Sequence, residues 1–302
     1  MKERTLADKI RDLKKLRNAV IVAHNYQRDE VQDIADYVGD SLGLSQEAAK
    51  SHADVIVFCG VHFMAETASI LSPSKTILMP DLGAGCPMAN MITAESLRTL
   101  KKKHPEATVV CYVNTTAEVK AESDICCTSS NAVKVVESVE GSEVIFVPDK
   151  YLAHYVSTKT KKKIIPWNGY CPTHFRILPE HILTQKGLHP EAEVMVHPEC
   201  TPPVIALADK VLSTGGMCKY AKESKASEII VGTEIGILHR LRKENPNKKF
   251  YPASESAICP NMKLTTVEKV FWSLENMKYV VKVPDDIRIS ARNAVDKMLR
   301  VL

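Results

Sequence analysis

A pattern of short apolar runs occurs three times along the chain, and this repeat is the strongest constraint on its fold. The tetrapeptide His-Pro-Glu-Ala occurs at residues 104–107 and again 85 positions later at 189–192. Each copy precedes a short apolar run, and a third such run lies 88 positions before the first. These runs span residues 20–23, 109–113 and 194–197. Unalternating, β-branched runs of this kind are typical of parallel strands that are buried on both faces.

Two further sets of apolar runs follow nearly the same intervals, and helical patterns separate them. The second set spans 54–59, 142–147 and 227–232, and the third, which opens with lysine and ends at proline, spans 75–80, 163–166 and 249–252. Helices are expected before each first strand, at 6–17, 94–104 and 178–187. Helical spacing also relates two sets of residues between the strands: Val31, Ile34, Ala35 and Val38, and Ile235, Leu238 and Arg242.

The repeat predicts an α/β fold of three pseudo-threefold-related, three-layer α/β/α domains around a central active site. Each domain is expected to hold a small parallel sheet of three strands with right-handed crossovers. The expected domains are residues 1–91, 92–176 and 177–302. The last amphipathic stretch, 284–302, lies outside the repeat, and we expect it to pack across the units.

Composition excludes several classes of protein. Of the 302 residues, 45% are hydrophobic and 25% are charged, which is typical of globular proteins. No apolar run approaches a membrane span, and the charged start lacks the apolar core of a signal peptide, so a cytoplasmic protein without membrane association is expected. The net charge is only +4, and no aromatic ladder accompanies the lysine runs, which argues against nucleic-acid binding.

Three of the nine cysteines follow the repeat. Cys86, Cys171 and Cys259 lie 85 and 88 positions apart, and they alone are followed by proline. A threefold arrangement would bring their thiols to one point, where they could hold three corners of a [4Fe–4S] cluster and leave the fourth iron open. Buried structural cysteines and a zinc site are the alternatives. The other six thiols are expected to be core or incidental residues: Cys59, Cys111, Cys126, Cys127, Cys200 and Cys218.

Polar residues at the ends of the first strands also repeat. His24 and Tyr26 align with Tyr112 and Asn114, and with His197 and Glu199. Alternate residues point to the same side of a strand, so these six side chains are expected to face the axis at the carboxyl ends of the sheets. A third set, before expected helix starts, provides hydroxyls that could cap helices or bind an anion: Ser41, Ser129 and Thr214, with Ser213 beside the last.

Several motifs together resemble the quinolinate synthase family over about residues 18–263. They are His24-Asn25-Tyr26, Asp40-Ser41, PDLGAGCPMA at 80–89, YVNT at 112–115, NGYCPTH at 168–174, HPEC at 197–200, STGGM at 213–217 and GTE at 232–234.

The resemblance implies a dehydrating condensation of iminoaspartate with dihydroxyacetone phosphate in NAD biosynthesis, which yields quinolinate, phosphate and two waters. It implies an oxygen-sensitive [4Fe–4S] cluster on Cys86, Cys171 and Cys259, and it leaves room for coupling to an iminoaspartate-producing enzyme. Tyr26 and Glu199 would be the main proton-transfer groups, and His197 would be the third catalytic residue. The residues that would bind or orient substrate are His24, Ser41, Tyr112, Asn114, Ser129, His174, His197, Ser213 and Thr214.

One departure from the family pattern concerns cysteines that some members carry ahead of the third ligand. Ala253 and Ser256 stand there, so a thiol-disulfide switch at this place is not expected.

Two other functions remain open. One is a different hydro-lyase that uses an open iron site on a hydroxy acid, and the other is a non-enzymatic iron–sulfur sensor or electron carrier. A sensor would not need His24, Tyr26, Asn114 and Glu199 near the cluster. A radical enzyme that uses S-adenosylmethionine is disfavoured because no close three-cysteine motif is present.

Overall fold

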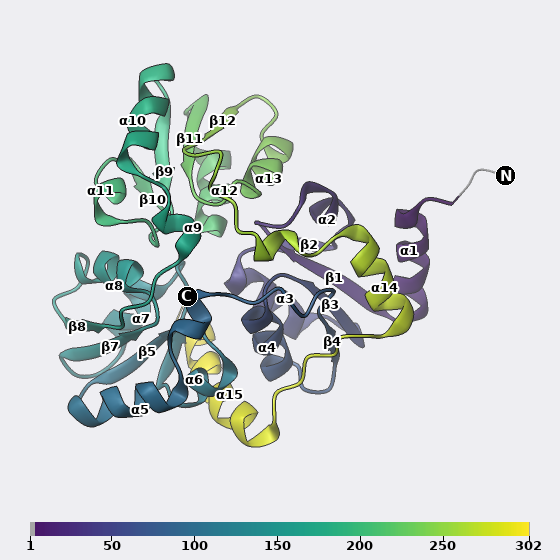
Figure 1. Cartoon of the computed structure of the whole chain (residues 1–302), viewed down its shortest axis with the longest axis horizontal. Coiled ribbons are helices and arrows are strands. Elements are labelled where there is room, and N and C mark those ends of the chain that lie inside the picture. Colours follow the sequence, from purple (N-terminus) through teal and green to yellow (C-terminus); the bar gives the residue numbers. More distant parts are fainter. Residues whose placement is uncertain (1–3, 302) are drawn as a thin grey trace.

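Three parallel sheets form the framework of the protein in the computed structural model, which describes residues 4–301. The sheets and their helices form three units around a common centre (Figure 1). This arrangement confirms the predicted α/β class and the three repeats. One sheet falls within each of the predicted ranges 1–91, 92–176 and 177–302, whose boundaries stay predictions; residues 1–3 and 302 lie outside the described residues.

The elements of the three repeats follow one another in nearly the same order. The first repeat contains α1 (Leu6–Leu16), β1 (Ala19–His24), α2 (Asp29–Ile34), β2 (Tyr37–Gly39), α3 (Ser41–Lys50), β3 (Val55–Cys59), α4 (His62–Leu71), β4 (Thr76–Leu78) and η1 (Met88–Met91). The second contains α5 (Ala94–Lys103), β5 (Thr108–Tyr112), α6 (Ala117–Ala121), β6 (Ile125–Cys127), α7 (Ala132–Ser138), β7 (Glu143–Val147), α8 (Lys150–Ser157), β8 (Lys163–Pro166) and α9 (Pro172–Phe175). The third contains α10 (Pro179–Leu188), β9 (Glu193–Val196), α11 (Pro202–Ile205), β10 (Lys210–Val211), α12 (Thr214–Glu223), β11 (Glu228–Gly232), α13 (Ile237–Glu244), β12 (Lys249–Pro252) and η2 (Asn261–Lys263).

Each sheet has four strands, so the expectation of three strands was wrong. The orders are β2-β1-β3-β4, β6-β5-β7-β8 and β10-β9-β11-β12, and all neighbours pair in parallel. The additional edge strands are only two or three residues long. Too few residues are present for a recognisable pattern of side chains, and these strands are defined by their main-chain pairing with the neighbouring strand.

The helix expected over Val31–Val38 ends at Ile34, because the chain turns there to form β2. An aspartate side chain fixes this turn: Asp36 accepts a hydrogen bond from Ile21 N at 2.8 Å. Asp124 accepts from Val109 N and Asp209 from Val194 N, both also at 2.8 Å. In every repeat, an equivalent aspartate beside the edge strand therefore accepts a hydrogen bond from the main chain of the first strand. Similarly, Ile235 precedes α13, which begins at Ile237.

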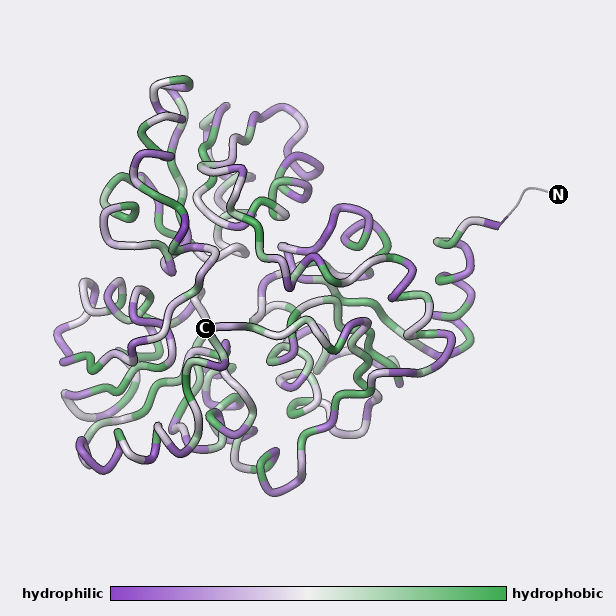
Figure 2. The backbone as a smooth tube through the Cα atoms, in the orientation of Figure 1, coloured by the Kyte–Doolittle hydropathy of each residue, from purple (hydrophilic) through white to green (hydrophobic). Residues whose placement is uncertain are grey.

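The central strands form the core. Every residue of β3 is buried, and the strand interiors are the most apolar parts of the chain, whereas the outer helices are largely hydrophilic (Figure 2). Phe58 and Phe146 are among the largest fully buried side chains. Removing each such side chain from water stabilises the fold by about 1.5–3 kcal/mol, which is why short strands suffice.

The two C-terminal helices leave the third repeat and return to the other two. Helix α14 (Val267–Asn276) packs against α1 and β3, and α15 (Asp285–Arg300) packs against α6, β6 and α4. Arg292 of α15 donates to Leu71 O of the first repeat, and Lys297 donates to Asp124 O of the second. The prediction that the last stretch packs across the units is confirmed up to Val301. Within residues 4–301, no helix combines the length and the apolar character that a membrane crossing demands.

Candidate active site

A cavity of about 230 Å³ lies where the three repeats meet. Its lining includes all but one of the residues that the sequence placed in the site: His24, Tyr26, Ser41, Cys86, Tyr112, Asn114, Ser129, Cys171, His174, His197, Glu199, Thr214 and Cys259. Ser213 is the exception, because its hydroxyl caps α12 by accepting from Gly216 N at 3.1 Å. The cavity sits at the carboxyl ends of the parallel strands, where open α/β sheets bind ligands.

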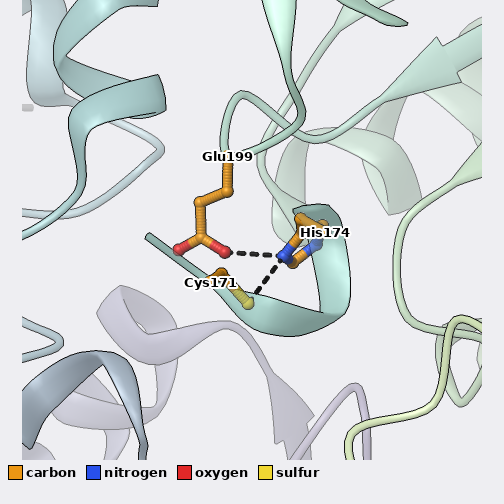
Figure 3. Close-up of side chains that lie close together, drawn as sticks. All are labelled: Cys171, His174 and Glu199. Carbon is orange, nitrogen blue, oxygen red and sulfur yellow. Dashed lines mark hydrogen bonds and ion pairs between the residues drawn. The ribbon is translucent and has the colours of Figure 1, made fainter. Parts of the chain in front are cut away.

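A histidine and a carboxylate form the polar centre of the cavity. His174 Nδ1 lies 2.7 Å from Glu199 Oε2 and 3.1 Å from Cys171 Sγ (Figure 3). Burial alone would raise the pKa of Glu199, but His174 and His197, including the hydrogen bond from His174, outweigh it and lower that pKa to about 2. Glu199 is therefore ionised near neutral pH, and its Oε2 accepts a hydrogen bond from the Nδ1–H group of His174.

Two hydroxyls extend this pair into a relay. Thr233 Oγ1 lies 2.8 Å from His174 Nε2 and 2.5 Å from Tyr26 Oη. Because His174 Nδ1 donates to Glu199, its Nε2 accepts from Thr233, and Thr233 in turn accepts from Tyr26. Burial raises the pKa of Tyr26 well above its usual value, and the Glu199 charge adds to this rise, so Tyr26 keeps its proton.

The other two lining histidines are neutral. Burial lowers the pKa of His24 to about 4 and that of His197 to about 3. His24 Nδ1 accepts from Tyr26 N, while His197 Nε2 lies 3.2 Å from Ser129 Oγ. Burial likewise raises the pKa of Tyr112 well above its usual value, and the Glu199 charge raises it further. Neutral groups that can donate or accept hydrogen bonds therefore lie close to the ionised Glu199.

The lining carries two acceptors without partners and the starts of two helices. Asn114 Oδ1 and Glu199 Oε1 are buried and have no hydrogen-bond partner among residues 4–301. Ser41 and Thr214 are the first residues of α3 and α12, whose opening N–H groups favour anions. Ser129 differs, because α7 begins only at Ala132. Buried acceptors without partners are rare in folded proteins, so these two point to a ligand that donates hydrogen bonds.

The three repeat cysteines have the same local structure. Each precedes a proline and a short helical turn, namely η1, α9 and η2. Burial raises the pKa of Cys86 to about 12 and also raises the pKa of Cys171 and Cys259, while backbone N–H groups two or three residues further on oppose the rise. Charge on Cys259 would raise the pKa of Cys86, and charge on Cys86 that of Cys171, so the thiols lie within electrostatic reach of one another.

The remaining six cysteines are buried and lie outside the cavity lining, as expected for core residues. Cys126 and Cys127 belong to β6, which pairs with β5. The sequence had placed this pair outside the repeat, whereas it occupies the edge strand that every repeat contains.

Sequence analysis gave no role to three buried residues near the site: Thr233, Asp149 and Glu234. Asp149 and Glu234 each lie two residues beyond a central strand, β7 or β11. Tyr151 N and Leu152 N donate to Asp149 Oδ1 at 2.8 and 2.7 Å, and Cys259 N donates to Glu234 Oε1 at 3.1 Å. Asp149 and Glu234 occupy equivalent positions in the repeat, and this equivalence could have identified them from the sequence.

The fold and the cavity together define a three-repeat α/β protein whose candidate active site is lined by residues of all three repeats. Comparison with known proteins agrees. The family described as quinolinate synthetase A protein matches residues 8–300. A quinolinate synthase of Dehalococcoides mccartyi (strain CBDB1) is 61% identical over 297 residues, which cover 98% of each chain. The quinolinate synthase of Methanosarcina barkeri (strain Fusaro) is 59% identical over 301 residues, covering 100% of this chain and 99% of that protein. The chain belongs to the quinolinate synthase family.

Proposed function

We propose that the protein condenses iminoaspartate with dihydroxyacetone phosphate to give quinolinate, phosphate and two waters, as a step of NAD biosynthesis in the cytoplasm. The enzyme would thus be a dehydrating transferase. The observation that carries the proposal is that one thiol from each repeat lines the same cavity as the Tyr26–Thr233–His174–Glu199 relay.

The donor set fits a [4Fe–4S] cluster held by Cys86, Cys171 and Cys259. Cubane clusters prefer thiolates that accept N–H hydrogen bonds, and each of these sulfurs faces backbone N–H groups of the turn that follows it. No fourth cysteine lines the cavity among the described residues. When bound, such a cluster supplies a Lewis-acidic iron with a free position for a substrate oxygen.

A lone zinc ion on Cys171, His174 and Glu199 fits less well, although their donor atoms lie within 4.8 Å of one another. His174 Nδ1 already donates to Glu199 and would have to give up this hydrogen bond to bind a metal. In addition, the three repeat cysteines occupy equivalent positions in the three repeats, whereas His174 and Glu199 do not occupy positions equivalent to them.

The relay provides the proton transfers that the reaction needs. Enolising a triose phosphate and forming an imine require an acid and a base near adjacent atoms. Glu199 holds His174 in the tautomer whose Nε2 is a free acceptor toward Thr233. As Tyr26 Oη takes a proton from the substrate, its own proton would pass to Thr233 and that of Thr233 to His174 Nε2, and the reverse movement would return a proton to the substrate. General acid–base catalysis of this kind contributes about 10²- to 10⁴-fold to a rate.

The remaining lining residues would hold the two substrates together. Asn114 Oδ1 is an acceptor without a partner and could bind an amino or hydroxyl group, and Tyr112 lies beside Glu199. Ser41 and Thr214, at helix starts, suit carboxylates or a phosphate, and so does Ser129, which His197 orients. His24 completes this wall. Ser213 would act indirectly, because it caps the helix that Thr214 begins.

The direct test is an anaerobic assay of the reconstituted protein with both substrates. Quinolinate and phosphate are expected in equal amounts, and omission of either substrate should abolish the pyridine product. Dehydration of a hydroxy acid without any pyridine product would instead indicate the hydro-lyase alternative. A cluster whose spectrum does not respond to either substrate would favour an electron carrier.

A further inference from the structure

We propose that Glu234 and Lys263 form a positioning pair that fixes the reactive Tyr26 relative to the metal ligand Cys259. This inference rests on the proposed function, since it assumes that both residues act in the site. It assigns a role to the buried ion pair, which neither the relay nor the cysteines explain. The pair joins the third repeat to the first at the edge of the cavity.

Glu234 is completely buried, and its two carboxylate oxygens have three kinds of partner. Oε1 accepts from Cys259 N at 3.1 Å, Oε2 accepts from Gly236 N at 2.8 Å, and Lys263 Nζ lies 3.0 Å from Oε1. A buried carboxylate is costly without such partners. Burial raises the pKa of Glu234, and the Lys263 charge opposes that rise. The carboxylate therefore fixes the backbone of Cys259 while the lysine balances its charge.

Lys263 carries this link to the first repeat. Its Nζ also donates to the main-chain carbonyl of Tyr26 at 2.6 Å, and its own carbonyl accepts from Arg28 Nε at 2.8 Å. At the other end of Tyr26, the hydroxyl contacts Thr233, which directly precedes Glu234. Tyr26 is thus held at both ends by consecutive residues of the third repeat, at its hydroxyl directly and at its carbonyl through Lys263.

Gly236 is closely packed against Lys263, Glu234 and the main chain of Tyr26. A Cβ atom on Gly236 would lie 2.6 Å from Lys263 Nζ and 2.9 Å from the carbonyl carbon of Tyr26. Gln32 reaches across from the first repeat and donates to Gly236 O at 2.8 Å. The glycine therefore allows the lysine, the carboxylate and the Tyr26 main chain to meet.

The second repeat has the carboxylate but not the lysine. Asp149 occupies the position equivalent to Glu234; burial raises its pKa well above the usual value, and the N–H group of a repeat cysteine, Cys171, opposes that rise. Among the described residues, no ion pair joins Asp149 to a lysine or arginine. A carboxyl group near a repeat cysteine thus recurs without a lysine. Lys263 is the addition that connects the Glu234 carboxylate to Tyr26, as a positioning role requires.

The test compares Lys263→Met with Lys263→Arg, Glu234→Gln and the double variant Glu234→Gln/Lys263→Met. Lys14→Met is the matched control, since Lys14 pairs with Asp36 at similar burial (side chain 20% exposed against 18% for Lys263) but outside the cavity lining. Each anaerobically reconstituted protein is measured for bound iron, for the rate at which a chelator removes that iron, and for kcat and KM.

We expect Lys263→Met to lower kcat by about 10- to 100-fold with nearly unchanged KM, because misplacing a reacting group by about 1 Å costs this much. Chelation should accelerate by about tenfold, since Cys259 is less firmly held. Lys263→Arg should recover most of both properties, and Lys14→Met should match the wild type. The double variant should lose no more than the worse single variant, because the two residues act through one another.

Wild-type rates of both turnover and iron removal in Lys263→Met and Glu234→Gln would overturn the positioning role. If Glu234→Gln fails to fold, Lys263→Met, whose side chain is partly exposed, and the uncharged double variant still decide the question. A wild-type protein that binds no iron would instead refute the proposed function, so the two failures are distinguishable.

Discussion

His174 Nδ1 lies 2.7 Å from Glu199 Oε2, and both side chains are almost completely buried, at 2% and 3% exposure. The neighbouring histidines keep the pKa of Glu199 low enough for this carboxylate to remain charged. The charge fixes which nitrogen of His174 holds the proton, and hence the direction of the relay through Thr233 to Tyr26. Two of our predictions concern this relay.

Glu199→Gln should retain iron but lose quinolinate formation. Glutamine keeps the size and an acceptor oxygen but lacks the negative charge that favours proton movement along the relay, so kcat should fall by about 10²-fold or more. Iron content and steady-state turnover of the variant check this. Turnover within a few-fold of the wild type would remove Glu199 from the mechanism.

Thr233→Val should interrupt the relay between Tyr26 and His174. Valine has the same shape as threonine but removes the hydroxyl that contacts both Tyr26 and His174, so kcat should fall by about 10- to 100-fold, and the free energy of unfolding should fall by about 1–3 kcal/mol. Thr233→Ser, which keeps the hydroxyl, is the control and should retain most of the activity. A fully active valine variant would show that protons do not pass through this hydroxyl.

The three repeat cysteines should be necessary for iron binding, whereas the other cysteines should not. Cys86→Ala, Cys171→Ala and Cys259→Ala should each lose the brown absorbance of the reconstituted protein, because a cubane needs all three of these ligands. Cys127→Ala and Cys218→Ala remove buried thiols outside the cavity and should keep it. Normal iron and sulfide in a repeat-cysteine variant would refute that ligand.

The buried, neutral His24 should make stability depend on pH. Its pKa is about 4 in the folded protein, below the ordinary value of 6.5, so the unfolded chain binds the additional proton as pH falls through this window. The free energy of unfolding should therefore decrease below about pH 6.5, by up to about 1.4 kcal/mol per pH unit for this residue.

Asparagine is the matched replacement for His24, since its side-chain oxygen can still accept from Tyr26 N. Anaerobic urea titrations at several values between about pH 6.5 and about pH 5 should give a shallower dependence for His24→Asn than for the wild type. Equal slopes would mean that His24 is not held neutral.

The repeat made much of this architecture predictable. Three apolar runs recur in every repeat, and copies such as 54–59, 142–147 and 227–232 support one another. Strand β2 was missed because only Tyr37–Gly39 form it, and its hydrogen bonds to β1 depend on main-chain pairing and on Asp36. The helix expected across this turn ended early for the same reason.

The candidate site was predictable where polar residues occupy equivalent positions in the three repeats, as His24, Tyr112 and His197 do. Contacts between repeats were not predictable in this way. Thr233 matters because it reaches Tyr26 of the first repeat, and Lys263 because it reaches the same residue from beyond the third sheet. Such contacts depend on how the repeats pack, which the spacing along the chain does not specify.

The most direct test of the account is to measure iron, sulfide and quinolinate on one anaerobic preparation. We predict about four iron and four sulfide ions per chain, and quinolinate formation that needs both substrates and stops when the iron is removed by a chelator. Full quinolinate formation by iron-free protein would contradict the account, and so would a fully loaded protein that forms no quinolinate from the two substrates.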